Sequence, residues 1–228
     1  MREDRVEDAS YFVQELRLAR GNARPADVNA LRLIAETDEG LREIITVNGC
    51  APIVEQLVYS TTKSAGVGAR AIYERLVHAA DLGERGSTTI VKTLASMLGL
   101  QLTALQQQRA LTALATFIFA SDDNCSIFVS NLGATDALVP SLGSHDPEVR
   151  RLALVIAHKL CTSATGASVR IDACGGGDLL LRTLASCSGE HEKATALDLL
   201  LLLPGGRYKL GGLTLCLLRV QGLVLPPE

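Results

Sequence analysis

Tryptophan is absent from the sequence, and only 4% of its residues are aromatic. Since β-sandwiches and β-barrels take much of their core from aromatic and β-branched residues, this shortage disfavours an all-β fold. Hydrophobic residues nonetheless make up 47% of the 228 positions, so the core must consist of Leu, Ala, Val and Ile. Such small and branched aliphatic side chains interdigitate well between helices, and we therefore expect an all-α protein.

A charge excess of either sign is also missing, because the formal net charge is only −3 at pH 7. Without a broad positive field to hold phosphate groups, we expect neither nucleic acid nor a membrane as partner. The longest apolar runs, 197–203 and 210–218, fall short of the roughly 18 residues that a membrane span requires. The charged N-terminus MREDRVEDAS resembles no secretory or mitochondrial signal, so the mature chain is expected to begin there.

Metal-binding spacings are missing as well. The six cysteines include no Cys-x-x-Cys pair, and the four histidines share no ligand spacing. We therefore expect no metal site and no cofactor. Cysteines placed in this way behave as small core residues in a reducing compartment, so the predicted location is the cytoplasm, with the nucleus as the alternative.

An apolar-apolar-x-x-Leu pattern recurs five times along the chain. Its final leucines stand at positions 16, 57, 94, 142 and 184, which places them 41, 37, 48 and 42 residues apart. Each copy is followed by an Ala-rich segment with helical periodicity, and these segments predict helices over 25–36, 66–80, 101–120, 147–162 and 190–203. A period of about forty residues indicates a repeat architecture.

The fourth copy has the clearest helix start. Asp146 suits the N-cap, Pro147 suits the first helical position, and Glu148 favours the positive end of the helix dipole. The residues that follow place one apolar face on the helix, formed by Val149, Leu152, Ala153, Ile156, Ala157 and Leu160.

The stretch 133–160, GATDALVPSLGSHDPEVRRLALVIAHKL, resembles the second and third helices of an armadillo repeat. Segments that resemble the first armadillo helix end at Gly49, Gly133 and Gly177. The segment before Gly86, ADLGER, is too short for such a helix, and we expect that repeat to have lost it.

The resemblance implies an all-α, right-handed solenoid of about five armadillo-like repeats without a β-sheet. It implies one domain over residues 1–228. The expected repeats are 1–37, 38–81, 82–121, 122–163 and 164–204, followed by a C-terminal cap or partial repeat over 205–228.

In armadillo proteins the third helix of each repeat lines the concave face, and nuclear-import adaptors carry there a ladder of Asn with Trp one turn earlier. Alignment of the Ala-rich helices places Glu36, Arg75, Thr116, Lys159 and Leu200 at the Asn positions. The same alignment places Arg32, Ala71, Thr112, Val155 and Ala196 at the Trp positions. No position matches, so we do not expect recognition of nuclear-localisation peptides by that mechanism.

Basic side chains remain as the candidates for binding in the middle of this face. Arginine pairs in a bidentate manner with carboxylates, which points to an acidic segment of a protein partner. The alternative, that these are solvated surface charges, stays open. The predicted partner-binding residues are Arg32, Glu36, Arg70, Arg75, Arg109, Thr112, Thr116, Arg151, Val155 and Lys159.

The predicted function is a non-catalytic scaffold that binds a protein partner. The length and the segment SHDPEVRRLAL also resemble nucleotide exchange cofactors of the 70-kDa heat-shock chaperone. If this alternative holds, the protein should speed the release of labelled ADP from that chaperone. A substrate-binding part of a ubiquitin ligase is a further alternative, as is self-association through the hydrophobic C-terminal end. An enzyme is disfavoured, because only the pair His158 and Cys161 suggests nucleophilic chemistry and no orienting group accompanies it.

Overall fold

The computed structural model describes residues 8–79, 82–187, 189–206 and 211. These residues form thirteen α-helices and contain no strand. The bounds are α1 (Ala9–Ala19), α2 (Pro25–Ile34), α3 (Asp38–Thr46), α4 (Cys50–Tyr59), α5 (Lys63–Val77), α6 (Gly83–Leu98), α7 (Ala104–Ala120), α8 (Asp122–Ser130), α9 (Ala134–Leu138), α10 (Pro147–Ser163), α11 (Ala167–Ala173), α12 (Gly176–Ser186) and α13 (Glu190–Leu202), with the 3-10 helix η2 (Val139–Gly143) after α9.

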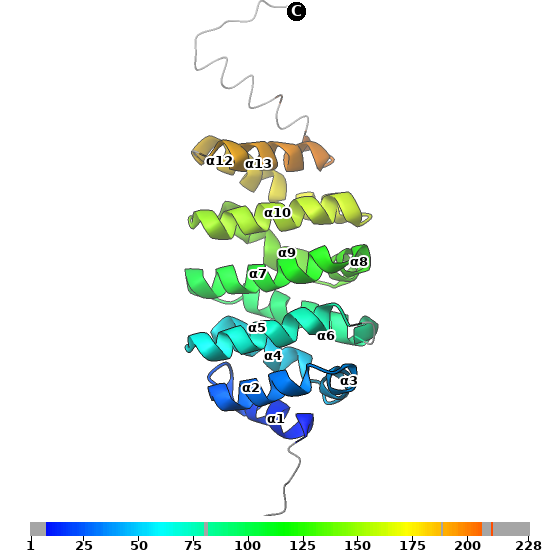
Figure 1. Ribbon diagram of the computed structural model, residues 1–228. Helices are drawn as coiled ribbons and strands as arrows, with labels where there is room; N and C mark the ends of the chain where they lie inside the picture. The colour runs from blue at the N-terminus through cyan, green and yellow to red at the C-terminus, as the bar shows by residue number, and fades with distance from the viewer. Residues whose placement is uncertain (1–7, 80–81, 188, 207–210, 212–228) are drawn as a thin grey trace, which may run out of the picture.

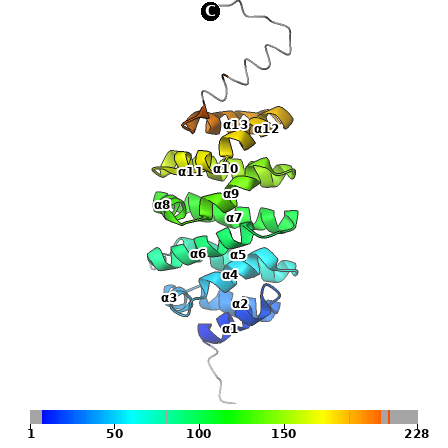
Figure 2. The same cartoon turned by 180° about the vertical axis from the view of Figure 1, so that it is seen from behind.

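The helices are stacked in layers along one axis (Figure 1). The last helices of successive layers, α2, α5, α7, α10 and α13, lie side by side on one face, which we call the front face. Seen from behind, α3, α6, α8 and α11 follow one edge of the stack (Figure 2). Each layer packs on the layers next to it, so the all-α solenoid predicted from the repeat is confirmed.

The repeated apolar pattern forms the centre of each layer. All three of its positions are buried in the first four copies, and most are completely inaccessible to solvent. In the fifth copy Leu180 is buried, whereas Leu181 and Leu184 are only half-buried. The pattern therefore marks the side chains that each layer turns toward the shared core.

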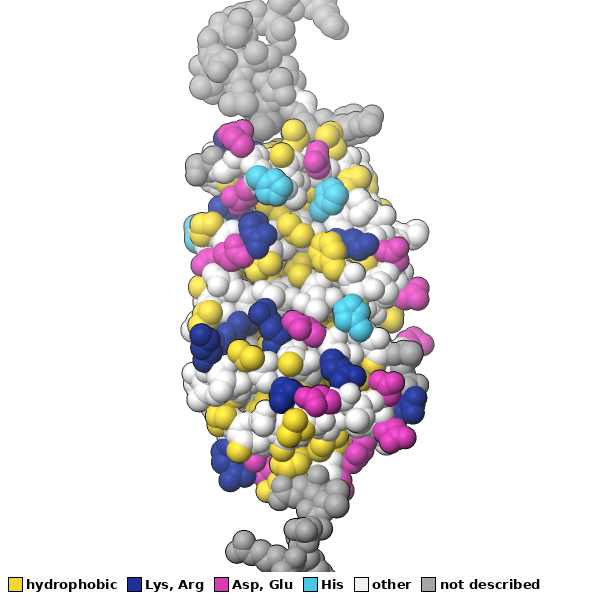
Figure 3. All heavy atoms as spheres, in the orientation of Figure 1, with side chains coloured by type: hydrophobic (Ala, Val, Ile, Leu, Met, Phe, Trp, Pro, Cys, Tyr) yellow, Lys and Arg dark blue, Asp and Glu magenta, His cyan; other side chains and the backbone are white. Residues whose placement is uncertain are grey.

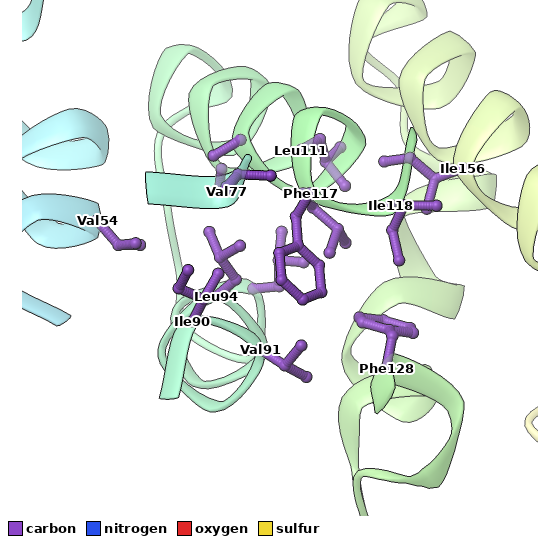
Figure 4. Close-up of a cluster of buried hydrophobic side chains, with 14 of the residues drawn as sticks. Val54, Val77, Ile90, Val91, Leu94, Leu111, Phe117, Ile118, Phe128 and Ile156 are labelled. Atoms are coloured by element: carbon purple, nitrogen blue, oxygen red, sulfur yellow. The ribbon is translucent and has the colours of Figure 1, made fainter. Parts of the chain in front are cut away.

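The middle of the core lies where α6, α7 and α8 meet (Figure 4). Phe117 of α7 points toward Leu94 and Val91 of α6 and toward Phe128 of α8. All four side chains are fully buried, so this cluster joins the third layer to the fourth.

Two local departures from a regular repeat have simple causes. Only one helix, α6, lies between α5 and α7 in the described residues, as the short segment before Gly86 predicted. In the fourth layer the expected helix is divided into α9 and η2. Pro140 explains the division, because it has no N–H to donate within an α-helix and its ring clashes with the preceding turn.

The helix start predicted at Asp146 is confirmed. Its carboxylate accepts hydrogen bonds from the backbone N–H groups of Glu148 and Val149 at 3.0 and 2.9 Å, and Pro147 is the first residue of α10. The same carboxylate accepts from Nε2 of Gln108 in α7, at 3.2 Å. Asp146 thus caps its own helix and ties it to the layer before.

Replacing Asp146 with Ala is expected to lower the melting temperature at pH 7. The hydrogen bonds from Val149 and Gln108 hold the pKa of Asp146 below its ordinary value of about 3.9. Since the folded-state pKa is depressed, the carboxylate stabilises the fold above pH 3.9, and this contribution is lost as the pH falls through the folded-state pKa. Melting curves of both proteins from pH 7 to pH 2 should converge; a constant difference would contradict this account.

Both ends of the sequence lie largely outside the described residues. This applies to residues 1–7 and to the predicted cap or partial repeat at 205–228, of which only Gly205, Gly206 and Gly211 are described. The predicted self-association through the hydrophobic C-terminal end falls there as well. The division into five repeats with the boundaries given above remains our proposal.

Candidate functional site

The front face carries a pocket of about 420 Å³ between α5 and α7. We call it the α5–α7 pocket. It brings together four of the predicted partner-binding residues, Arg70, Arg109, Thr112 and Thr116. The residues that line it are Leu57, Thr61, Thr62, Lys63, Gly66, Val67, Arg70, Tyr73, Glu74, Leu105, Gln108, Arg109, Thr112, Ala113 and Thr116.

Arg109, in the lining of this pocket, is anchored by backbone carbonyls. Its Nη1 donates hydrogen bonds to the carbonyl oxygens of Ser60, at 2.6 Å, and Val58, at 3.4 Å. These carbonyls stand at the end of α4, where the last turn of a helix leaves its oxygen atoms without partners. The guanidinium therefore joins α7 to the preceding layer and is held in one position.

The two threonines of the pocket are satisfied within α7. The Thr112 hydroxyl donates to the carbonyl of Gln108 at 2.7 Å, and the Thr116 hydroxyl donates to the carbonyl of Thr112 at 3.0 Å. Both side chains are half-buried. They supply polar walls, whereas the charge of the pocket comes from its basic residues.

A second hollow, of about 810 Å³, adjoins the first between α2 and α5. Arg32 is one of its lining residues, and the two hollows share Lys63 and Val67. Lys63 was not among the predicted binding residues, because the helix expected over 66–80 begins three residues earlier, at Lys63 itself. A basic residue just before the expected helix was the sequence feature that could have identified Lys63 as a site residue.

Five of the six predicted basic residues are paired with carboxylates of this chain, including Arg70 with Glu74 at 3.8 Å. The N–O distances are 2.6 Å for Arg32–Glu36, 3.8 Å for Arg75–Asp38, 2.6 Å for Arg151–Glu148 and 2.8 Å for Lys159–Asp122. The hydrogen bond to Asp122 raises the pKa of Lys159 and lowers that of Asp122. In Figure 3 the basic side chains gather at the left edge over α5 and α7, and elsewhere on this face they alternate with acidic ones.

The alignment used for the last helix of the front face was wrong. Ala196 and Leu200, which the alignment placed on the exposed face, are fully buried. At the other end of the face, α2 ends at Ile34, so Glu36 lies beyond the helix and not on it. Val155 is half-buried on α10.

The described residues give no support to catalytic chemistry at His158 and Cys161. Burial raises the pKa of Cys161 to about 12, so the sulfur stays protonated near neutral pH and is a poor nucleophile. No three His, Cys, Asp or Glu side chains of the described part are grouped so that they could hold a metal ion. No helix in that part is both long and apolar enough to cross a membrane.

No protein-family model matches the sequence, and no curated protein matches it. Solved structures do match the fold. One, an engineered protein, is 22% identical with a TM-score of 0.58, over 87% of this chain and 80% of that one. Another, a designed armadillo repeat protein in complex with the peptide (KR)4, is 16% identical with a TM-score of 0.57, over 85% of this chain and 81% of that one.

A third match is to computationally designed armadillo repeat proteins for modular peptide recognition, at 17% identity and a TM-score of 0.57, over 86% of this chain and 82% of that one. The fold is therefore that of an armadillo-like repeat protein, as the resemblance of residues 133–160 implied. At these identities the matches establish the fold alone.

Proposed function

We propose that the chain is a non-catalytic scaffold that binds an extended segment of a partner protein along its front face. The observation that carries the proposal is the pair of adjoining hollows across α2, α5 and α7, which share Lys63 and Val67. Two neighbouring hollows on successive layers suit a chain that crosses several repeats better than a single small ligand.

The chemistry of these hollows favours an acidic segment. The α5–α7 pocket is lined by Lys63, Arg70 and Arg109, against one carboxylate, Glu74. A basic peptide such as the (KR)4 bound by the designed protein would meet like charges here, which costs binding energy. Opposite charge on the partner is therefore the complementary choice.

We also propose that the protein works in a reducing compartment, the cytoplasm or alternatively the nucleus. The five described cysteines, Cys50, Cys125, Cys161, Cys174 and Cys187, are all free thiols. Desolvation by burial raises the pKa of Cys50 to about 11, which suits a core residue that remains reduced. The two narrower hypotheses, a chaperone exchange cofactor and a ligase component, stay predictions.

Charge reversal on the front face tests the scaffold. In the double variant Arg75→Glu/Lys159→Glu, two added carboxylates would repel an acidic segment, and we expect capture of protein partners from cell extract to fall at least tenfold. The measurement is affinity capture with quantitative mass spectrometry, and the helical circular dichroism and melting temperature should show that the fold persists.

The matched control is Lys92→Glu, an exposed position on α6, away from the front face. It changes the net charge in the same direction and should leave capture unaltered. Partners retained equally by wild-type protein and the double variant would refute the front face as the binding surface.

A further inference from the structure

We propose that the α5–α7 pocket binds a phosphorylated side chain of the partner segment. This inference rests on the proposed function, since it names the chemical group that the front face recognises. The ligand is a phosphomonoester carried by a phosphoserine or phosphothreonine, and three residues hold it: Lys63, Arg70 and Arg109.

The charge balance of the pocket carries the inference. Lys63 and Arg70 are seven residues apart, which places them on the same side of α5, and Arg109 faces them from α7. Glu74 is the single carboxylate in the lining, so the pocket has a net charge of +2 in a chain whose net charge is −3. A phosphomonoester has a charge of about −1.5 to −2 at neutral pH and therefore matches this pocket better than one carboxylate.

Two of the three cations are available to a ligand. Lys63 has no ion pair or hydrogen bond with any part of the chain that the structure describes. Arg70 meets only Glu74, at 3.8 Å, and both side chains are 55% exposed, so this contact contributes little. By contrast, Arg32, Arg151 and Lys159 are held at 2.6 to 2.8 Å by carboxylates of their own chain.

Arg109 contributes a donor whose position is fixed before binding. Its Nη1 is occupied by the carbonyls of Ser60 and Val58, while the guanidinium has further N–H donors on Nε and Nη2. A fixed guanidinium loses little conformational entropy when it binds an oxyanion. The start of α5 adds the partial positive charge of its helix dipole, and the Thr62 side chain accepts no hydrogen bond from the first N–H groups.

The apolar rim of the pocket sets a preference for the residues next to the phosphate. Val67 and Leu105 are 60% and 56% exposed on its two sides. The volume of about 420 Å³ exceeds that of a phosphate group and leaves room for a neighbouring side chain. Aliphatic residues beside the phosphorylated residue would cover this exposed surface.

Three fluorescein-labelled peptides of identical sequence test the proposal. Each has aliphatic residues on both sides of a central position, which is phosphoserine, serine or glutamate. We expect fluorescence anisotropy to show at least tenfold tighter binding of the phosphoserine peptide than of the other two. Equal binding of the glutamate peptide would overturn the proposal in favour of a carboxylate site.

Variants locate the binding to the pocket. Lys63→Ala and Arg70→Ala should each weaken phosphoserine binding about tenfold, the expected loss for one charge-assisted hydrogen bond. Lys92→Ala removes an equal charge from α6 and should have no effect. Phosphoserine binding that survives the double variant Lys63→Ala/Arg70→Ala would place the site elsewhere and refute the proposal.

O-Phosphoserine alone provides a readout that does not depend on the peptide sequence. In ¹H–¹⁵N spectra it should shift the amides of Lys63 to Val67 and of Arg109, and no shift at millimolar concentration would refute the pocket. Binding to phosphatidylinositol-phosphate vesicles without binding to phosphoserine would indicate a membrane surface and also overturn the proposal.

The outcomes separate this inference from the proposed function. If partner capture depends on Arg75 and Lys159 but O-phosphoserine does not bind, the scaffold stands and the phosphate pocket falls. If O-phosphoserine binds in the pocket but charge reversal leaves capture unchanged, the pocket stands as a phosphate site, and the proposal that the partner segment extends along the front face to Arg75 and Lys159 falls.

Discussion

Phe117→Ala is expected to lower the free energy of unfolding by about 3–5 kcal/mol. Phe117 is fully buried, and its ring lies among Leu94, Val91 and Phe128, which come from the helices on either side of α7 (Figure 4). Truncation removes the buried ring and leaves a cavity where the third and fourth layers meet. Because neighbouring layers stabilise each other, this cavity weakens the solenoid at its middle.

Urea unfolding, followed by circular dichroism, measures this effect. Phe119→Ala is the matched control, because Phe119 lies two residues further along the same helix and is 53% exposed. That substitution should change the free energy of unfolding by no more than about 0.5 kcal/mol. Similar losses for the two variants would show that Phe117 does not occupy the shared core.

The layers of the fold were predictable because their signals are local. The apolar pattern identified core positions in four layers, and a short stretch around Asp146 and Pro147 located the start of α10. Such signals depend on helical periodicity and on capping, both of which act within one turn or two. In the described residues no α-helix lies between α5 and α6, as the short segment before Gly86 predicted.

The contacts between layers were not predictable in the same way. The hydroxyl of Tyr73 donates to the carbonyl of Ala113, and that of Thr183 donates to the carbonyl of Leu142, each at 2.9 Å. The partners in these two hydrogen bonds are 40 and 41 residues apart in the sequence. Predicting them would require the exact register of successive helices. In α13 leucines occupy every side of the helix, and its apolar pattern therefore could not define a register.

The candidate site was predictable in part, because the order of the repeats determines which helices are neighbours. Arg70, Arg109, Thr112 and Thr116 lie on adjacent helices of the front face, and the repeat order alone brings them together. The partners of Arg75 and Lys159 are Asp38 and Asp122, which belong to the first helices of layers. Their pairing depends on how first and third helices are oriented, which periodicity does not specify.

Glu192→Ala is expected to lower the stability of the last described layer by about 2–3 kcal/mol, less than for a fully buried ion pair because both side chains are partly exposed. Glu192 of α13 forms an ion pair with Arg150 of α10, and their side chains are only 15% and 13% exposed. Arg150 also donates to the carbonyl of Ser144 at 2.8 Å, so it cannot turn toward solvent without losing that bond. Removal of the carboxylate leaves a mostly buried charge without its counter-ion, which costs more than the pair itself contributes.

Hydrogen exchange tests this prediction, because it reports each layer separately. In the variant, amides of α13 should exchange faster, while those of α5 and α7 should be unchanged. Glu190→Ala is the control, since the side chain of Glu190 is 87% exposed in its pair with Lys193. Arg150→Met/Glu192→Leu should restore most of the protection, because it replaces both charges with apolar groups. Unchanged exchange of α13 in Glu192→Ala would mean that apolar packing alone holds the last layer in place.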